Sequence, residues 1–189
     1  IERRNVEAFV KKQTGRDFTM PGPVESNPYR NLALNPKDVM GKANSYPHAS
    51  SNSEYEGKEC FAAKCAIDGR LENIGHGPSF PSWGPDKIDD PWWMVEFGKE
   101  VETDRIDIFI RAQFPHDSYW NTATLEFSDG SRVEIILAKS AGRQSFYFPK
   151  RRTTFVKIVN LKQEEPKGWC GLTEVEVWGR DAVQLAARE

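Results

Sequence analysis

The chain has 189 residues, of which 29% are charged, 12% are aromatic and six are tryptophan, and its net charge is −2 at pH 7. Because there is no basic excess, nucleic acid and anionic membrane surfaces are not expected as partners. No stretch approaches the ~20 consecutive apolar residues of a transmembrane helix, so we expect no membrane insertion.

The start of the chain is predicted to be an extension of the main domain. Residues 1–15 have apolar side chains at helical spacing from Val6 onwards, with Asn5 as a cap, and predict a short helix. Residues 16–30 contain proline and glycine and predict a linker. The chain begins at Ile1 without a methionine or a signal-like segment, so we expect a fragment of a longer protein.

The compact domain is expected to span residues 31–180, after the extension at 1–30 and before a polar tail at 181–189. Its first part is polar and rich in small residues, and one short strand is predicted at 41–46. A run of small apolar residues follows at 61–67 and ends at an Asp-Gly pair.

A long loop at 72–91 contains several glycines and prolines and shows no regular pattern. Such a loop inside a compact domain is typically functional or tightly packed. It leads to a strand predicted at Trp92–Phe97, which Gly98 is expected to close.

Residues 104–137 carry the clearest pattern in the chain. Ile106, Ile108 and Ile110 alternate with other residues, which predicts a half-buried strand. Alternation on both sides of Asp129-Gly130 predicts a β-hairpin, because glycine supplies the positive φ of a tight turn. The loop between these strands has no core to fill, yet it gathers aromatic and hydrogen-bonding side chains. They are Phe114, His116, Asp117, Tyr119 and Trp120.

Three more strands are predicted at 144–148, 153–161 and 172–178. With the preceding ones they make about eight antiparallel strands separated by turn residues, with no internal helix. The sequence therefore predicts an all-β chain that folds as an antiparallel β-sandwich.

Motifs of catalysis and of metal or redox chemistry are missing from the sequence. Cys60, Cys65 and Cys170 form neither a CxxC nor a Cys/His cluster, and we expect free thiols in preference to a disulfide. There is no nucleophile elbow, phosphate-binding glycine loop or HExxH motif, and no spacing selects a glycosidase acid pair. The fragment itself is therefore not expected to be an enzyme.

Five short motifs occur in a fixed order along the chain. They are AIDG (66–69), SWG (82–84), WWMVEFGKEVETDRIDI (92–108), LEFSDGS (125–131) and LTEVEVWG (172–179). Together they resemble discoidin-type, galactose-binding-like domains, and most of all the family-32 carbohydrate-binding modules. The resemblance covers roughly residues 31–180 and implies a jelly-roll sandwich of about eight strands, which agrees with the strand pattern.

The resemblance also implies a structural calcium site. Asp68 and Glu174 lie on the motifs that carry this site in the family, and Glu72 or Asn73 are possible further ligands. Calcium takes six to eight oxygen ligands at roughly 2.3–2.6 Å, and a tight Asp-Gly loop can turn carbonyl oxygens inward. The alternative is that Asp68 only initiates a turn and Glu174 faces solvent.

A sugar offers flat C–H patches beside its hydroxyl groups, so its sites combine an aromatic platform with charged hydrogen-bonding groups. Trp120 or Tyr119 is predicted to be the platform, while donors and acceptors come from Arg111, His116 and Asp117. The alternative is an ordered loop in which His116 and Asp117 pair with each other and Trp120 covers the end of the sandwich. Further ligand candidates are Trp169, in a Pro/Gly loop, and secondarily Trp83 and His48.

The sequence therefore predicts a non-catalytic carbohydrate-binding module, covalently linked to a larger carbohydrate-active protein. The competing hypothesis is a discoidin-like domain that binds protein or acts as a structural spacer without sugar affinity. An extracellular or cell-surface location is favoured over a cytoplasmic one. The sequence does not name the sugar or the oligomeric state.

Overall fold

The structure is a computed structural model, and it describes residues 3–15, 26–75, 77–164 and 168–183. Most of the predicted linker and of the predicted polar tail lies outside these residues. The N-terminal helix is confirmed as α1 (Arg3–Thr14). Because α1 begins before Asn5, the prediction that Asn5 caps it is wrong.

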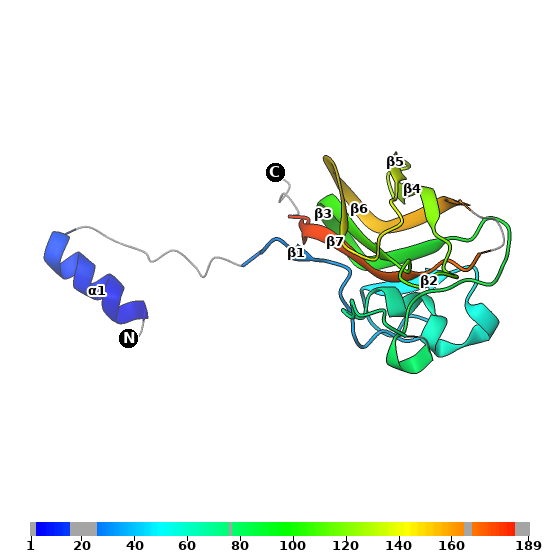
Figure 1. Cartoon of the computed structure of the whole chain (residues 1–189). Helices are drawn as coiled ribbons and strands as arrows, with labels where there is room; N and C mark the ends of the chain where they lie inside the picture. The colour runs from blue at the N-terminus through cyan, green and yellow to red at the C-terminus, as the bar shows by residue number, and fades with distance from the viewer. Residues whose placement is uncertain (1–2, 16–25, 76, 165–167, 184–189) are drawn as a thin grey trace.

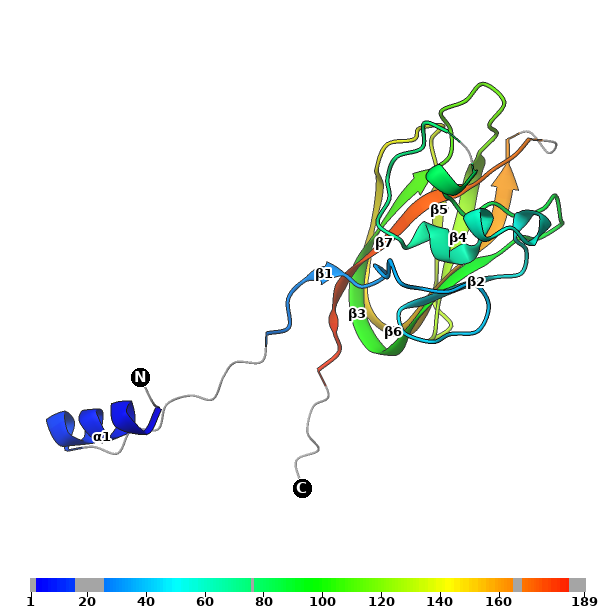
Figure 2. The same cartoon turned by 90° about the horizontal axis from the view of Figure 1, so that it is seen from below.

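The described part of the main domain is one antiparallel sheet of seven strands in the order β1-β7-β3-β6-β4-β5, with β2 paired to β3. The strands are β1 (Arg30–Asn31), β2 (His48–Ser51), β3 (Trp93–Ile110), β4 (Trp120–Phe127), β5 (Arg132–Ile136), β6 (Gln144–Gln163) and β7 (Leu172–Asp181). The long strands bend, so that the sheet wraps around a single core (Figure 1, Figure 2). The predicted all-β sandwich is confirmed.

In two places, two strands that were predicted separately form one continuous long strand. The strand predicted to end at Gly98 continues through β3, and β6 likewise joins the segments predicted at 144–148 and 153–161. The pairing of β3 with β6 is interrupted by a register shift between Glu96 and Val101, where Gly98 has a φ of +68°. A glycine can adopt this conformation inside a strand, so it bends β3 without ending it.

The first part of the domain differs most from the sequence prediction. The strand predicted at 41–46 is wrong, because this segment forms bends and β2 starts only at His48. The expectation of no internal helix is also wrong, because the described residues include four short 3-10 helices. They are η1 (Tyr55–Gly57), η2 (Glu59–Phe61), η3 (Ala63–Ala66) and η4 (Gly77–Ser79). Small side chains such as Ala62 and Ala66 are fully buried, which lets these turns pack closely on the sheet.

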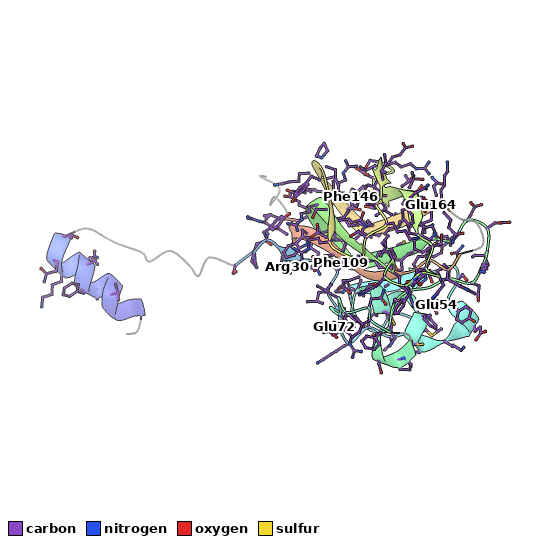
Figure 3. The ribbon with its side chains drawn as sticks, viewed as in Figure 1. Arg30, Glu54, Glu72, Phe109, Phe146 and Glu164 are labelled. Atoms are coloured by element: carbon purple, nitrogen blue, oxygen red, sulfur yellow. The ribbon has the colours of Figure 1, made fainter. Side chains whose placement is uncertain are left out.

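Ile106, Ile108 and Ile110 are buried in the core as predicted, but the prediction of a half-buried strand is wrong, because Asp107 and Phe109 on the other face are buried as well. The hairpin of β4 and β5 is confirmed, with Gly130 at a φ of +80°. Figure 3 shows Phe146 on one side of the sandwich, and Glu54 and Glu72 on the side that carries the helical turns.

The residues just before β1 are tied to the last strand. The backbone of Asp181 and the side chain of Asn27 exchange two hydrogen bonds, of 2.9 and 3.1 Å. The ring of Tyr29 stacks on Trp178 with centroids 6.0 Å apart. No helix in the described part of the chain is long and apolar enough to span a bilayer.

Candidate functional site

A cavity of about 290 Å³, the first cavity, opens where loops from distant parts of the sequence meet. Its polar wall is formed by three side chains proposed from the sequence, Arg111, His116 and Asp117. Its aromatic wall is formed by Tyr55, Phe61 and Trp169. The structure therefore places an aromatic surface opposite charged hydrogen-bonding groups.

The loop that carries Asp117 is held by hydrogen bonds within the loop and to the segment that contains Trp169. Asp117 N donates to Phe114 O at 3.0 Å, and Phe114 N donates to the Asp117 carboxylate at 3.2 Å. Ser118 N donates to Trp169 O at 2.9 Å, and Asp117 forms a parallel bridge with Trp169. These bonds dock the loop on the segment that presents Trp169, which explains why residues distant in sequence share one cavity.

Arg111 follows the last residue of β3, and its backbone N–H donates to Gly171 O at 2.9 Å. This close approach requires glycine, because a Cβ at position 171 would lie 2.9 Å from Trp83 O. The Arg111 side chain is buried, with Nε 3.6 Å from Asp117 Oδ1. Burial lowers the pKa of Arg111, and the charge of Asp117 acts in the opposite direction.

His116 is the exposed member of the polar wall. Its side chain is 58% exposed, and Nε2 lies 3.6 Å from Asp117 Oδ1. The guanidinium of Arg111 approaches the same carboxylate, so its positive charge is balanced within the cavity. The polar wall therefore offers several donors and an acceptor with little net charge.

The aromatic wall was largely missed by the sequence analysis. Tyr55 meets Phe61 edge-on with centroids 5.4 Å apart, and meets Trp169 edge-on at 4.9 Å. Trp169, a ligand candidate from the sequence, remains 42% exposed and lines the first cavity. No motif or spacing marks Tyr55 or Phe61, because both come from short turns whose position depends on tertiary packing.

Two of the proposed aromatic candidates do not line the first cavity. Trp120 is only 1% exposed, and its ring stacks on Trp83 with centroids 5.4 Å apart. Trp83 is also buried, and its Nε1 donates to Ser53 O at 3.0 Å. The expectation that Trp120 or Trp83 presents a platform is therefore wrong, because each tryptophan fills the core beneath the cavity.

Two other candidates are likewise engaged elsewhere. His48 is buried, with Nδ1 2.7 Å from Asp38 Oδ1 and Nε2 2.9 Å from Gly41 O. Tyr119 is half-buried and packs against the core. His48 therefore fixes the segment before β2, and neither residue lines the first cavity.

The proposed calcium ligands lie at another place, where the loop after Ile67 meets β7. Glu174 is 1% exposed, so the alternative that it faces solvent is wrong. Both of its carboxylate oxygens lie 3.2 Å from Gly69 N, which donates to them. The pKa of Glu174 is raised to about 8, mainly by burial and in addition by the charge of Asp68, while the hydrogen bond from Gly69 N acts in the opposite direction. Asp68 itself has a raised pKa, mainly because of burial.

These residues fit the donor chemistry of calcium. Asp68 and Glu174 are neighbouring carboxylates, and the buried Asn73 Oδ1 has no hydrogen-bond partner in the described residues. Calcium prefers such hard oxygen donors. Among the same residues no group of three or more His, Cys, Asp or Glu side chains is arranged for a metal, so backbone oxygens are needed as well. Glu72 is exposed.

No protein-family model and no curated protein matches the chain. Among solved structures, it is similar to a chitosan-binding module from a chitosanase/glucanase of Paenibacillus sp. IK-5. That module is 22% identical, with a TM-score of 0.56 over 79% of this chain and 98% of that one. A family 32 CBM from C. perfringens NanJ, solved with galactose, is 19% identical, with a TM-score of 0.55 over 69% and 91%.

A fucolectin from striped bass (Morone saxatilis) serum is 20% identical, with a TM-score of 0.59 over 82% of this chain and 50% of that one. At these identities the likeness shows the fold. The chain has the β-sandwich fold of these two sugar-binding modules and this fucolectin, as the sequence motifs implied.

Proposed function

We propose that the chain is a non-catalytic carbohydrate-binding module that holds a neutral sugar in the first cavity. The observation that carries this proposal is the meeting of Arg111, His116 and Asp117 with the exposed Trp169 in one hollow. The named structural neighbours are sugar-binding modules and a lectin, which supports the same conclusion.

The two walls match the two kinds of surface on a sugar. The rings of Tyr55 and Trp169 present apolar surface to the C–H groups of the sugar ring. Arg111 donates hydrogen bonds to hydroxyl oxygens, and Asp117 accepts them from hydroxyl groups. Because Arg111 is already compensated by Asp117, an anionic sugar gains little there, and a neutral sugar is favoured.

The first cavity is not equipped for glycoside hydrolysis. That reaction generally uses two carboxyl groups, about 5–5.5 Å or about 6.5–9.5 Å apart. Among the described residues that line the cavity, Asp117 is the only acid, and it lies against Arg111. We therefore propose that the module binds a sugar without hydrolysing it. We also propose that the module is attached to a larger carbohydrate-active protein and is exposed outside the cell.

We also propose a structural calcium ion held by Asp68 and Glu174, with Asn73 and backbone oxygens as further ligands. The ion supplies positive charge to the buried carboxylate of Glu174 and the half-buried carboxylate of Asp68. Asp68 and Glu174 then join the loop after Ile67 to β7. A protein-binding or spacer role is less well supported, because an open cavity lined by aromatic and polar groups does not resemble a loop surface filled by its own side chains.

The test is a glycan array in calcium buffer, followed by calorimetry on the sugars that bind. We expect Trp169→Ala to lower the affinity about tenfold or more. The matched control is Tyr147→Ala, because Tyr147 is 72% exposed and lies far from the cavity, against Arg105. An array without binding, or a Trp169→Ala variant that binds like the wild type, overturns the proposal.

A further inference from the structure

A second cavity, of about 300 Å³, lies beside the first one. The two share Pro85, Trp169 and Cys170. The second cavity is completed by the loop at 85–91 and by the end of β6. The proposed function uses only the first cavity, so the second requires its own explanation.

Trp169 stands between the two cavities. Tyr55, which meets its ring edge-on, lines only the first cavity, whereas Lys87 lines only the second. The Lys87 ammonium lies 4.4 Å from the centroid of the Trp169 ring. Because Trp169 is 42% exposed, a ligand can pass over its edge from one cavity to the other.

The wall of the second cavity contains a preorganised hydrogen-bond acceptor. Gln163 Nε2 donates to Gly168 O at 3.3 Å and to Cys170 Sγ at 2.9 Å. These bonds fix the amide so that Oε1 is the atom left to accept a hydrogen bond. Lys87 adds a donor, and the carboxylates of Asp89 and Asp90 add acceptors, so the cavity offers partners for both the donor and the acceptor role of a hydroxyl group.

Size and charge restrict the ligand. Small-molecule sites typically have volumes of roughly 300–1,000 Å³, so each cavity is suited to one sugar unit and neither to a long chain. The second cavity is lined by three acids, Asp86, Asp89 and Asp90, against the single cation Lys87. This excess of negative charge disfavours a uronic acid or a sulfated sugar and accepts a neutral or amino sugar.

We propose that the ligand contains at least two linked sugar units, which pass over Trp169 with the second unit in the second cavity. This inference rests on the proposed function, because the first unit occupies the first cavity. The second unit is neutral or carries an amine. The protein then recognises a disaccharide or a longer glycan in preference to a single sugar.

The experiment is calorimetry with methyl glycosides of galactose, glucosamine and fucose, and with the disaccharides formed by extending each with a hexose, an amino sugar or a uronic acid. For the sugar that binds, we expect the neutral or amino disaccharide to bind about tenfold more tightly than the monosaccharide, and the uronic acid to give no gain. Asp89→Ala should remove this gain and leave the affinity for the monosaccharide unchanged. Gln163→Ala should also remove the gain, but it should lower the affinity for the monosaccharide as well, because Gln163 holds Cys170 of the first cavity.

The two variants complement each other. Asp89 is exposed, so its replacement tests the ligand contact without affecting folding, whereas Gln163 also bridges Gly168 and Cys170. Equal affinities for monosaccharide and disaccharide in the wild type, or a gain that survives Asp89→Ala and Gln163→Ala, overturn the second subsite but leave the proposed function standing. If none of these ligands binds, the same comparison is made with the sugar that the glycan array identifies. An array without any binding overturns the proposed function together with the inference.

Discussion

Trp83 and Trp120 stack on each other with ring centroids 5.4 Å apart and an angle of 25° between their planes. Both are buried, so neither ring has a face open to solvent. This pair belongs to the core, whereas Trp169 is partly exposed and lines the first cavity. Tryptophans that look alike in the sequence therefore have different roles, and substitutions distinguish them.

The first prediction separates packing from ligand contact. Trp120→Ala should lower the free energy of unfolding by about 3–5 kcal/mol, because it leaves a cavity beside Trp83. Trp169→Ala should change stability by less than about 1 kcal/mol, because Trp169 is 42% exposed and lies outside the core. Urea denaturation of both variants measures this difference, and a Trp120→Ala variant as stable as the wild type contradicts the packing role.

The second prediction concerns the polar wall. Arg111→Ala should lower both stability and sugar affinity, because it leaves the buried Asp117 carboxylate without its guanidinium. Adding Asp117→Asn should restore part of the stability, since the uncompensated charge is gone, but not the affinity. His116→Ala should weaken binding with an unchanged melting temperature, because its side chain is mostly exposed. Additive losses of stability in the double variant would contradict the pairing.

The third prediction concerns calcium. A ligand that binds only the folded state stabilises it by about 2.7 kcal/mol at a hundredfold excess over Kd, so calcium should raise the melting temperature relative to chelator. Glu174→Gln and Asp68→Asn should abolish this increment. Glu72→Gln is the matched control and should keep it, because Glu72 is exposed. An unchanged melt of wild-type protein on chelation argues against the site.

The fourth prediction concerns Ser82, which lines the first cavity. Its Oγ is buried and has no hydrogen-bond partner among the described residues. A buried hydroxyl without a partner costs about 1–3 kcal/mol, so Ser82→Ala should raise the free energy of unfolding. Thr173→Val should lower the free energy of unfolding, because Thr173 Oγ1 accepts a 3.2 Å hydrogen bond from Asn73 Nδ2. A fall in stability for Ser82→Ala shows that its hydroxyl has a partner in solution.

The fifth prediction is a pH dependence set by Asp107, which is fully buried on β3. Burial raises the pKa of Asp107, but hydrogen bonds from Arg105 and Ser145 and the charges of Arg105 and Arg143 outweigh it, and the pKa lies below its usual range. Because the folded-state pKa is depressed, this group stabilises the fold above pH ~4, and its contribution is lost as the pH falls below that value.

The stability difference between wild type and Asp107→Asn should therefore be constant from pH 5 to 7 and shrink below pH ~4, by at most about 1.4 kcal/mol per pH unit. Urea denaturation of both proteins across this pH range measures the difference in the free energy of unfolding. The contributions of the other acids are the same in both proteins and cancel in this difference. A stability difference that grows toward acid pH contradicts a lowered pKa of Asp107 in the folded protein.

Much of the fold was predictable because strands leave a local signal. The alternation of Ile106, Ile108 and Ile110 and the turn at Asp129-Gly130 both specify their structure within a few residues. The errors occurred where local pattern is weak. A glycine at position 98 indicates a strand end in isolation, yet the pairing of β3 with β6 on both sides of it carries the strand through.

The sequence by itself determined the all-β fold, the polar residues Arg111, His116 and Asp117, and a tryptophan-bearing loop at 169. Only the tertiary structure decided that Trp120 is buried, that Tyr55 and Phe61 join the site, and that Trp169 divides two cavities. The physical reason is that burial of a ring depends on which distant segment covers it. Two backbone hydrogen bonds, from Ser118 N to Trp169 O and from Arg111 N to Gly171 O, join segments that are far apart in the sequence. No local pattern encodes these bonds.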